Sequence, residues 1–264
     1  MTGRSSRLPA SDRHSYILSE LQQNGRVLVE DLARALDTSE VTIRKDLTQL
    51  EAEGHLLRRH GGALPRMDPK QSGSSEQSEL SERKLMIATA AAALVQDHSR
   101  ILIDFGSTTT AMIPHLQARQ GLVIMTNSLR TAEAVLALEP PPTLLMTGGT
   151  WDAQTRSLQG QIAEQILGSY DFDQLFIGCD GLDPLRGTTT FNELLGLSRL
   201  MAGAAREVIV MATSDKAGRR IPNLELPWSK VNILITDAGL DADVRQQIEQ
   251  QGVRVISAPL QENK

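Results

Sequence analysis

The sequence predicts an α/β protein with a small N-terminal winged helix-turn-helix and a larger C-terminal domain built on a mostly parallel sheet. Three observations lead to this fold class. Two amphipathic segments near the N-terminus are separated by only two residues, a polar stretch follows them, and seven apolar runs then alternate with helical segments. A length of 264 residues also suits two unequal domains.

The polar stretch marks the boundary between the two domains. Residues 65–79 read PRMDPKQSGSSEQSE, with two Pro, one Gly, four Ser and almost no apolar side chain. Such a composition cannot bury enough surface to offset its ordering entropy, so it predicts a flexible linker. A long surface loop inside one domain is the alternative. The predicted organisation is a first domain over 1–66, a linker over 67–79 and a second domain over 80–264.

The first domain is predicted to contain three helices, over 11–24, 29–36 and 39–54. In the first, Ile17, Leu18 and Leu21 share one face. Ser39 is a good N-cap for the third, and Gly54 is a good stop signal. Only two residues separate the second helix from the third, and a helix-turn-helix requires such a short connection.

The third helix has two distinct faces. At 100° per residue, Ile43, Leu47 and Leu50 lie on one side and should face the core. The other side carries basic, amide, hydroxyl and methyl groups, which suit the base edges and phosphates of a DNA major groove. The candidate DNA-binding residues of this helix are Ser39, Val41, Thr42, Arg44, Lys45, Thr48 and Gln49.

A short hairpin is predicted directly after the third helix. The segment HLLRRHGGALP combines strand-like residues with a Gly-Gly turn, so Arg58, Arg59 and His60 could reach phosphates or the minor groove. Residues 1–66 carry a net charge of +1 whereas the remainder carries −6, as expected if only the first domain meets a polyanion. An ordinary three-helix bundle with a solvated basic face is the alternative.

The run SEVTIRKDLTQLEAEGHLLRRHGGA resembles the DNA-binding signature of the DeoR family of bacterial transcriptional repressors. The resemblance covers nearly all of residues 13–65. It implies that the partner is double-stranded operator DNA, bound by a homo-oligomer, either a dimer or a tetramer.

The second domain is predicted to be a parallel sheet covered on both faces, because near-continuous apolar runs alternate with helical segments. Ligands of such sheets bind at the carboxyl ends of the strands. The predicted strands cover residues 101–105, 122–125, 143–146, 175–177, 208–211, 233–235 and 253–256.

Polar residues follow five of these strands, which indicates a site for a polyol and a phosphate. A glycine turn with hydroxyls, DFGSTTT, begins a predicted helix that ends near Leu116, and such a helix N-terminus can bind phosphate. Simple helix capping and turn formation are the alternative at each position. The candidate ligand-binding residues are Asp104, Gly106, Ser107, Thr108, Thr109, Thr126, Asn127, Ser128, Gly148, Gly149, Asp180, Glu193 and Lys216.

Residues 80–258 resemble the DeoR-family sensor domain, which is related to ribose-phosphate isomerases. The motifs that carry this resemblance include DFGST, MTNSL, GCDGLD and GTTTFNE. Within the family they are most similar to repressors of glucitol (sorbitol) operons. The resemblance implies a phosphorylated sugar or polyol as effector, with glucitol 6-phosphate as the expected compound.

A regulator is favoured over an enzyme. The related isomerases keep a lysine and a glycine-rich loop after their paired aspartates, whereas here Asp183 and Pro184 are followed by Arg186, Gly187 and three threonines. A sugar-phosphate isomerase, with Glu193 as a possible base, and an activator of the same architecture are the alternatives.

The composition indicates which cofactors, disulfides and cellular compartment to expect. A single cysteine, Cys179, excludes an internal disulfide and a Cys-cluster metal site, and no metal or other cofactor is expected. Because no secretion signal or long apolar run appears, the chain is expected to be cytoplasmic, with no membrane partner. Aromatic residues make up only 3%, too few for a base-stacking platform that binds single strands.

Overall fold

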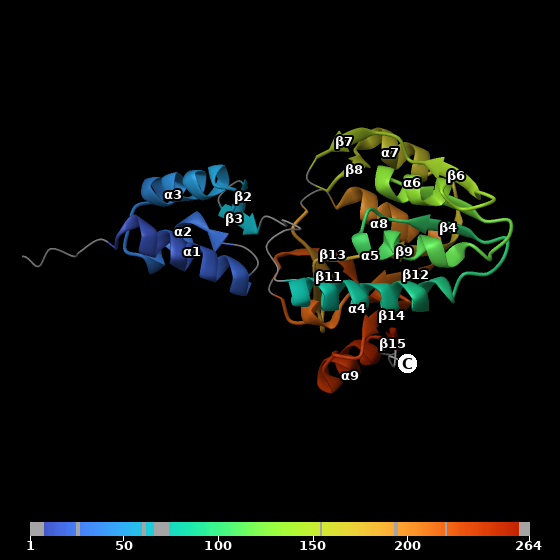
Figure 1. Ribbon diagram of the computed structural model, residues 1–264. Coiled ribbons are helices and arrows are strands. Elements are labelled where there is room, and N and C mark those ends of the chain that lie inside the picture. The colour runs from blue at the N-terminus through green and yellow to red at the C-terminus, as the bar shows by residue number, and fades with distance from the viewer. Residues whose placement is uncertain are drawn as a thin grey trace, which may run out of the picture. The chain divides into compact units, whose positions relative to one another are not determined.

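A computed structural model shows two compact units, which divide between residues 72 and 73 (Figure 1). The candidate residues His60 and Glu193 lie outside the part of the chain that the structure describes, as does most of the predicted linker. The described residues are 8–24, 27–59, 62–65, 74–153, 155–192, 195–219 and 221–258.

The N-terminal unit is a winged helix-turn-helix, as predicted. Its helices are α1 (Ala10–Asn24), α2 (Val29–Ala35) and α3 (Glu40–Ala52). Gly54 ends the third helix with a φ of 84°, a left-handed conformation that glycine adopts at little cost. Three short strands, β1 (Val27–Leu28), β2 (Leu56–Arg59) and β3 (Gly62–Pro65), pair antiparallel in the order β1-β3-β2.

The predicted linker is wrong over its last six residues. Helix α4 (Ser74–Ala92) already includes residues 74–79. This segment contains no Pro or Gly, and its Glu and Gln residues have good helix propensity. Because the later turns of α4 are anchored in the core by Ile87, Ala88 and Ala91, helix extension towards the N-terminus needs no new nucleation.

The C-terminal unit contains a seven-stranded parallel sheet, and all seven predicted apolar runs are its strands. Their order across the sheet is β15-β14-β12-β9-β4-β5-β6, and all pairs are parallel. The strands are β4 (Arg100–Ile103), β5 (Val123–Thr126), β6 (Thr143–Met146), β9 (Phe172–Ile177), β12 (Ala205–Met211), β14 (Ile233–Asp237) and β15 (Arg254–Ala258).

Helices pack on both faces of this sheet. Ile101 and Ile103 of β4 belong to one core with residues of α4 and α6, whereas Leu102 belongs to a second core with residues of α7, α8 and α9. This alternation explains why the strands are almost entirely apolar. The remaining helices are α5 (Ser107–Thr110), α6 (Leu129–Leu136), α7 (Gln161–Leu167), α8 (Gly196–Gly203) and α9 (Ala242–Gln250), with 3-10 turns η1 (Ile113–Leu116), η2 (Ser214–Lys216) and η3 (Trp228–Lys230).

The strand order reverses between β4 and β9. From β4 the chain proceeds outward through β5 to β6, and from β9 it proceeds in the other direction through β12 and β14 to β15. Such a reversal opens a crevice at the carboxyl ends of the two central strands, where ligands of open α/β sheets bind.

Two smaller sheets accompany the main one. An antiparallel sheet in the order β10-β11-β13 contains β10 (Gly181–Asp183), β11 (Gly187–Thr190) and β13 (Asn223–Pro227). A hairpin pairs β7 (Thr150–Asp152) with β8 (Ser157–Gln159). Because β10 and β11 follow β9 directly, the first of these sheets begins at the carboxyl edge of the main sheet, beside the strand reversal.

Candidate functional sites

The outer face of α3 is exposed as the helical periodicity predicts. Ile43 and Leu47 are buried, whereas Val41 is 62% exposed. Ser39 caps the helix, because its Oγ accepts a hydrogen bond from the backbone N–H of Thr42 at 3.2 Å. The residues of α3 that are exposed in the predicted DNA-binding set are Val41, Arg44, Lys45, Thr48 and Gln49, and Ser39 is exposed beside them.

The ion pair that Arg44 forms on this face is weak. Arg44 pairs with Glu40 at 2.7 Å, but both side chains are about half exposed. Such an i,i+4 pair contributes only about 0.3–0.5 kcal/mol, so the guanidinium of Arg44 can leave it for a phosphate or a base at little cost.

The hairpin that follows α3 contacts the helix through one predicted residue. Arg58 donates through Nη1 to the hydroxyl of Thr48 at 2.8 Å, and its backbone N–H donates to Glu51 at 2.9 Å. These bonds fix the hairpin beside the exposed face of α3. The side chain of Arg59 lies outside the described part of the chain.

A partly buried ion pair inside this unit was not predicted from the sequence. Asp46 lies on the core side of α3 and is 5% exposed. Its carboxylate accepts two bonds from the guanidinium of Arg13, from Nε at 2.8 Å and Nη2 at 2.9 Å. His14 Nε2 is 3.3 Å from the same carboxylate. The pair therefore ties α1 to the helix that carries the predicted DNA-binding residues, and the hydrogen bond to Asp46 raises the pKa of Arg13.

In the C-terminal unit, Asp104 lies at the strand reversal, and its carboxylate is already hydrogen-bonded to neighbouring groups of the protein. The carboxylate accepts from the backbone N–H groups of Gly106 and Gly178, both at 2.8 Å, and from the hydroxyl of Thr109 at 2.5 Å. It therefore joins the loops after β4 and β9 rather than pointing freely at a ligand. Burial raises the pKa of this carboxyl, and the three hydrogen bonds partly oppose that effect.

The predicted phosphate-binding helix is shorter than expected. Helix α5 is a single turn, and η1 follows it in place of one continuous helix to Leu116. Consecutive threonines disfavour a longer helix, and their hydroxyls bond inside the loop: that of Thr110 donates to the carbonyl oxygen of Gly106 at 2.9 Å. A single turn has only a small dipole, so the dipole argument for phosphate is weak here.

Cationic side chains converge beside this turn, and two of them were missed in the sequence. Lys84 of α4 donates to the hydroxyl of Ser107 at 3.3 Å, and Ser107 is exposed. The pKa of Lys84 is lowered, first by burial and then by the positive charge of Lys216, with Arg130 adding to the effect and Asp215 opposing it. Like charges held together in partly buried surroundings favour the binding of an anion between them.

Lys216 lies near the end of β12, as predicted, and reaches across to the next strand end. Its Nζ donates to the carbonyl oxygen of Cys179 at 2.5 Å. Lys216 is half-buried, and its charge acts on Asp104 and Lys84. The ammonium group of Lys216 thus connects the strand ends of β9 and β12, and its charge acts on Lys84, which bonds Ser107.

The strand end after β5 contributes one side chain with unused bonding capacity. Thr126 and Ser128 form the turn and the cap of α6: the Thr126 hydroxyl accepts from Ser128 N–H, and the Ser128 hydroxyl accepts from Thr131 N–H. Asn127 is 1% exposed, and its Oδ1 has no hydrogen-bond partner among the described residues.

Gly148 and Gly149 have a clear structural role. Gly149 has a φ of 110°, and a Cβ there would lie 2.5 Å from the carbonyl oxygen of Gln159. Gly148 also has a positive φ, of 63°. The two glycines therefore let the chain turn from β6 into the β7–β8 hairpin, and a ligand contact by either residue stays a prediction.

The two aspartates of the segment after β9 form hydrogen bonds within the protein. Asp180 accepts through Oδ2 from the Thr190 hydroxyl at 2.7 Å and from the Phe191 N–H at 3.0 Å. Asp183 accepts from two backbone N–H groups of the following turn. Cys179 is 8% exposed, and burial raises its thiol pKa to about 12, so this thiol is an apolar core group and no nucleophile.

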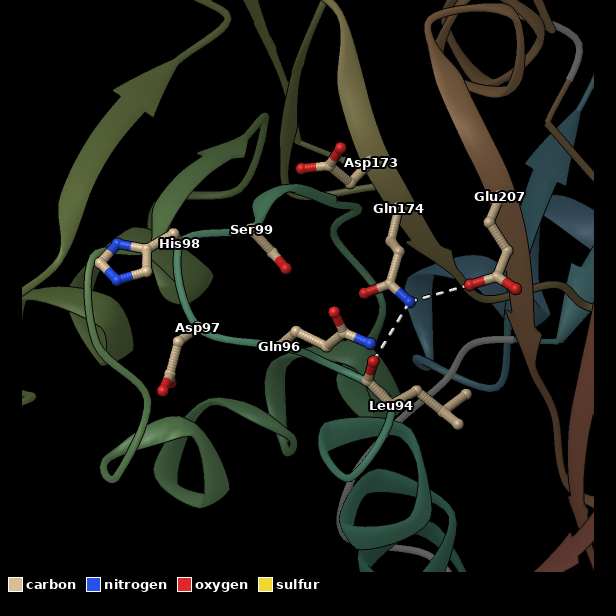
Figure 2. A pocket seen from close by; sticks show the side chains of 8 residues that line it. All are labelled: Leu94, Gln96, Asp97, His98, Ser99, Asp173, Gln174 and Glu207. Atoms are coloured by element: carbon tan, nitrogen blue, oxygen red, sulfur yellow. Dashed lines mark hydrogen bonds between the residues drawn. The ribbon is translucent and has the colours of Figure 1, made fainter.

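A separate pocket lies at the opposite edge of the sheet, beside the amino ends of the central strands (Figure 2). Gln174 crosses it, and its Nε2 donates to Glu207 at 2.8 Å and to the carbonyl oxygen of Leu94 at 3.3 Å. This pocket therefore holds none of the predicted site residues. Its lining consists of Leu94, Gln96, Asp97, His98, Ser99, Asp173, Gln174 and Glu207.

Two family models match the two units. Residues 13–65 match the DeoR-like helix-turn-helix domain, and residues 79–238 match the DeoR C-terminal sensor domain. No helix in the described part of the chain is long and apolar enough to span a bilayer.

Individual relatives agree with these matches. A protein of Escherichia coli O157:H7, named for transcriptional repression of the aga operon, is 36% identical over 93% of both chains. The HTH-type transcriptional regulator GlpR of Haloferax volcanii is 33% identical over 94% of this chain and 98% of its own. Among solved structures, ribose 5-phosphate isomerase A of Methanocaldococcus jannaschii aligns with 53% of this chain and 55% of its own, with 20% identity and a TM-score of 0.39.

Proposed function

This chain belongs to the DeoR family of DNA-binding transcriptional regulators and not to a family of enzymes, and from that premise we propose that it represses an operon for the use of a sugar or polyol. A phosphorylated sugar or polyol is the proposed effector. It binds at the carboxyl edge of the parallel sheet and changes the affinity of the N-terminal unit for DNA.

The exposed face of α3 carries the proposal for DNA. Arg44 and Lys45 are exposed on one side of a capped helix whose other side is buried, and this arrangement lets the side chains enter a major groove without disturbing the core. Two such units from a homo-oligomer bind two half-sites of an operator, as helix-turn-helix dimers do. Arg58 contacts backbone phosphate from the hairpin.

We expect Arg44→Ala and Lys45→Ala each to weaken operator binding about tenfold or more, because a base or phosphate contact of this kind is worth about 1–3 kcal/mol. Fluorescence anisotropy with an operator selected from a random DNA pool, measured over a range of salt concentrations, checks this. Arg206→Ala is the matched control, because Arg206 is an exposed arginine of the C-terminal unit. An Arg44→Ala protein that binds as tightly as the wild type at every salt concentration would refute the assignment.

The proposal for a phosphorylated effector rests on Lys84, which bonds the hydroxyl of Ser107, and on Lys216, whose positive charge acts on Lys84. Their mutual repulsion is relieved when a dianionic group binds between them, and the exposed Ser107 hydroxyl adds a hydrogen-bond donor. Glucitol 6-phosphate is the effector proposed from the resemblance of the motifs to those of glucitol repressors.

Transcription in vitro separates repression from activation. With a promoter that carries the selected operator, added protein should reduce the transcript, and a phosphorylated effector should restore it. An increase in transcript on adding the protein would favour the activator instead. The effector acts only through a difference in its affinity for the DNA-bound and free states, with a coupling of about 1–3 kcal/mol typical of such regulators.

A further inference from the structure

Three buried polar side chains, in segments that lead to or from the carboxyl edge of the sheet, each have an atom without a hydrogen-bond partner in the described part of the chain. The hydroxyls of Thr189 and Thr213 and the Oε2 of Glu225 have no hydrogen-bond partner among the described residues. These three side chains are at most 7% exposed. An unsatisfied buried polar atom costs about 1–3 kcal/mol, so each of these side chains has bonding capacity that a polar ligand can use.

The three residues come from segments that meet at the carboxyl edge. Thr213 directly precedes η2, which contains Lys216. Thr189 accepts through its carbonyl oxygen from the N–H of Asp180 at 3.0 Å, in the loop after β9. Glu225 lies on β13, the strand paired with β11, and its charge acts on Cys179, whose carbonyl oxygen binds Lys216.

Negative groups face the Glu225 carboxyl from the neighbouring loops. Asp180 after β9 and Asp104 after β4 repel a charge on it, and the hydroxyls of Ser198 on α8 and Thr188 on β11 stabilise that charge only in part. Arg199 of α8 is near, but its guanidinium donates to the backbone carbonyl oxygens of Glu225 and Leu224. Burial is the largest cause and repulsion by the two aspartates adds to it, so the pKa of Glu225 is raised to about 8 although the two hydroxyls lower it.

We propose that Glu225 is a specificity-determining residue of the effector site: its unpartnered Oε2 forms a hydrogen bond with a hydroxyl of the bound sugar phosphate, which also bonds the hydroxyls of Thr189 and Thr213. The inference rests on the proposed function, since it assigns the end of the effector that is distant from the phosphate. The phosphate is bound by the lysines, and the hydroxyl-bearing end meets Glu225.

The side chains of Glu225, Thr189 and Thr213 indicate a class of ligand. A neutral carboxylic acid and two hydroxyls can donate to and accept from sugar hydroxyls. A carboxylate at the same end of the ligand would be repelled by the negative charges of Asp104 and Asp180, and burying it near them is unfavourable. The site should therefore select phosphorylated polyols and sugars over phosphorylated sugar acids such as gluconate 6-phosphate.

The sign of the pH effect follows from protonation. Below pH 8 Glu225 is mostly protonated and can donate, whereas above pH 8 it is mostly ionised and has lost its donor. A group with a pKa of about 8 loses about nine-tenths of its protonated form between pH 7 and pH 9. Affinity for a hydroxyl-bearing effector should fall about tenfold over that interval.

Calorimetry on the full chain tests the proposal. The probes are glucitol 6-phosphate, fructose 6-phosphate, gluconate 6-phosphate and inorganic phosphate, each at pH 7 and pH 9. Glu225→Gln keeps a neutral donor at every pH, so it should bind the tightest sugar phosphate within about threefold of wild type at pH 7 and about tenfold better than wild type at pH 9. Comparing the two proteins at each pH cancels the titration of the phosphate and of Lys84.

Glu207→Gln is the matched control, because Glu207 lies at the amino edge of the same sheet; its affinities should follow those of wild type at both pH values. Inorganic phosphate should show no difference between wild type and Glu225→Gln. Thr213→Val gives a second test without a change of charge: it should weaken the sugar phosphate about threefold to tenfold and leave inorganic phosphate unchanged.

Each result decides between the two proposals. Equal pH profiles for wild type and Glu225→Gln, with sugar phosphates still bound, overturn the role of Glu225 and leave the proposed function standing. Gluconate 6-phosphate bound as tightly as glucitol 6-phosphate overturns the ligand class. If none of the phosphorylated compounds binds to the wild type, the proposed effector fails and this inference fails with it.

Discussion

Asp46→Ala should lower the free energy of unfolding of the N-terminal unit by about 1.5–3 kcal/mol, because it leaves the partly buried guanidinium of Arg13 without its carboxylate. The Arg13 and Asp46 side chains are 13% and 7% exposed, so water cannot replace the lost partner fully. Since Asp46 lies on α3, the loss should also weaken DNA binding, although its side chain lies on the side of α3 opposite the proposed DNA-binding residues.

Hydrogen exchange of backbone amides in α1 and α3 measures this effect within the full chain. Glu40→Ala is the control on the same helix: it removes the exposed pair with Arg44 and should cost no more than about 0.5 kcal/mol. The double variant Arg13→Met with Asp46→Leu should recover much of the loss, because neither charge remains buried alone. Protection in Asp46→Ala within about 1 kcal/mol of wild type would contradict the prediction.

Replacing Lys84 and Lys216 together with Ala should reduce affinity for the phosphorylated effector by about a hundredfold or more. A charge-assisted hydrogen bond contributes about 1.5–3 kcal/mol, which corresponds to roughly tenfold or more for each lysine. Each single variant should lose about tenfold.

Calorimetry with glucitol 6-phosphate and with unphosphorylated glucitol checks the lysine pair. The free polyol should bind far more weakly to the wild type and be almost insensitive to both substitutions. Lys230→Ala is the matched control, because Lys230 is an exposed lysine of the same unit. Equal affinity for the free and the phosphorylated polyol would exclude a phosphate site, and unchanged affinity in the double variant would exclude the lysines from it.

The fold was predictable because its signals are local. Helical periodicity separated Ile43 and Leu47 from Val41 and Arg44 without any knowledge of the partners of α3. Each strand of the parallel sheet is apolar because both of its faces are covered, so the strands appear as separate apolar runs in the sequence. The last part of the linker was the exception, because composition cannot reveal that a packed helix extends into it.

The candidate effector site was predictable only in outline. Parallel strands place their carboxyl ends at one edge, so Asp104, Asn127, Asp180 and Lys216 were expected at the same edge of the sheet. Which side chains keep free bonding capacity was not predictable. Asp104 uses its carboxylate on its own loops, whereas Asn127 keeps an unpartnered oxygen.

The sequence by itself determined the winged helix-turn-helix, the face of α3 that is turned to solvent, the seven strands and the edge of the sheet where polar residues collect. Only the tertiary structure decided that Arg13 pairs with Asp46, that Lys84 reaches Ser107 and that Glu225 is buried near Asp104 and Asp180. The physical reason is the separation along the chain between the residues that interact. Periodicity and strand-end chemistry depend on neighbours along the chain, whereas ion pairing and burial depend on residues that packing brings together from distant segments.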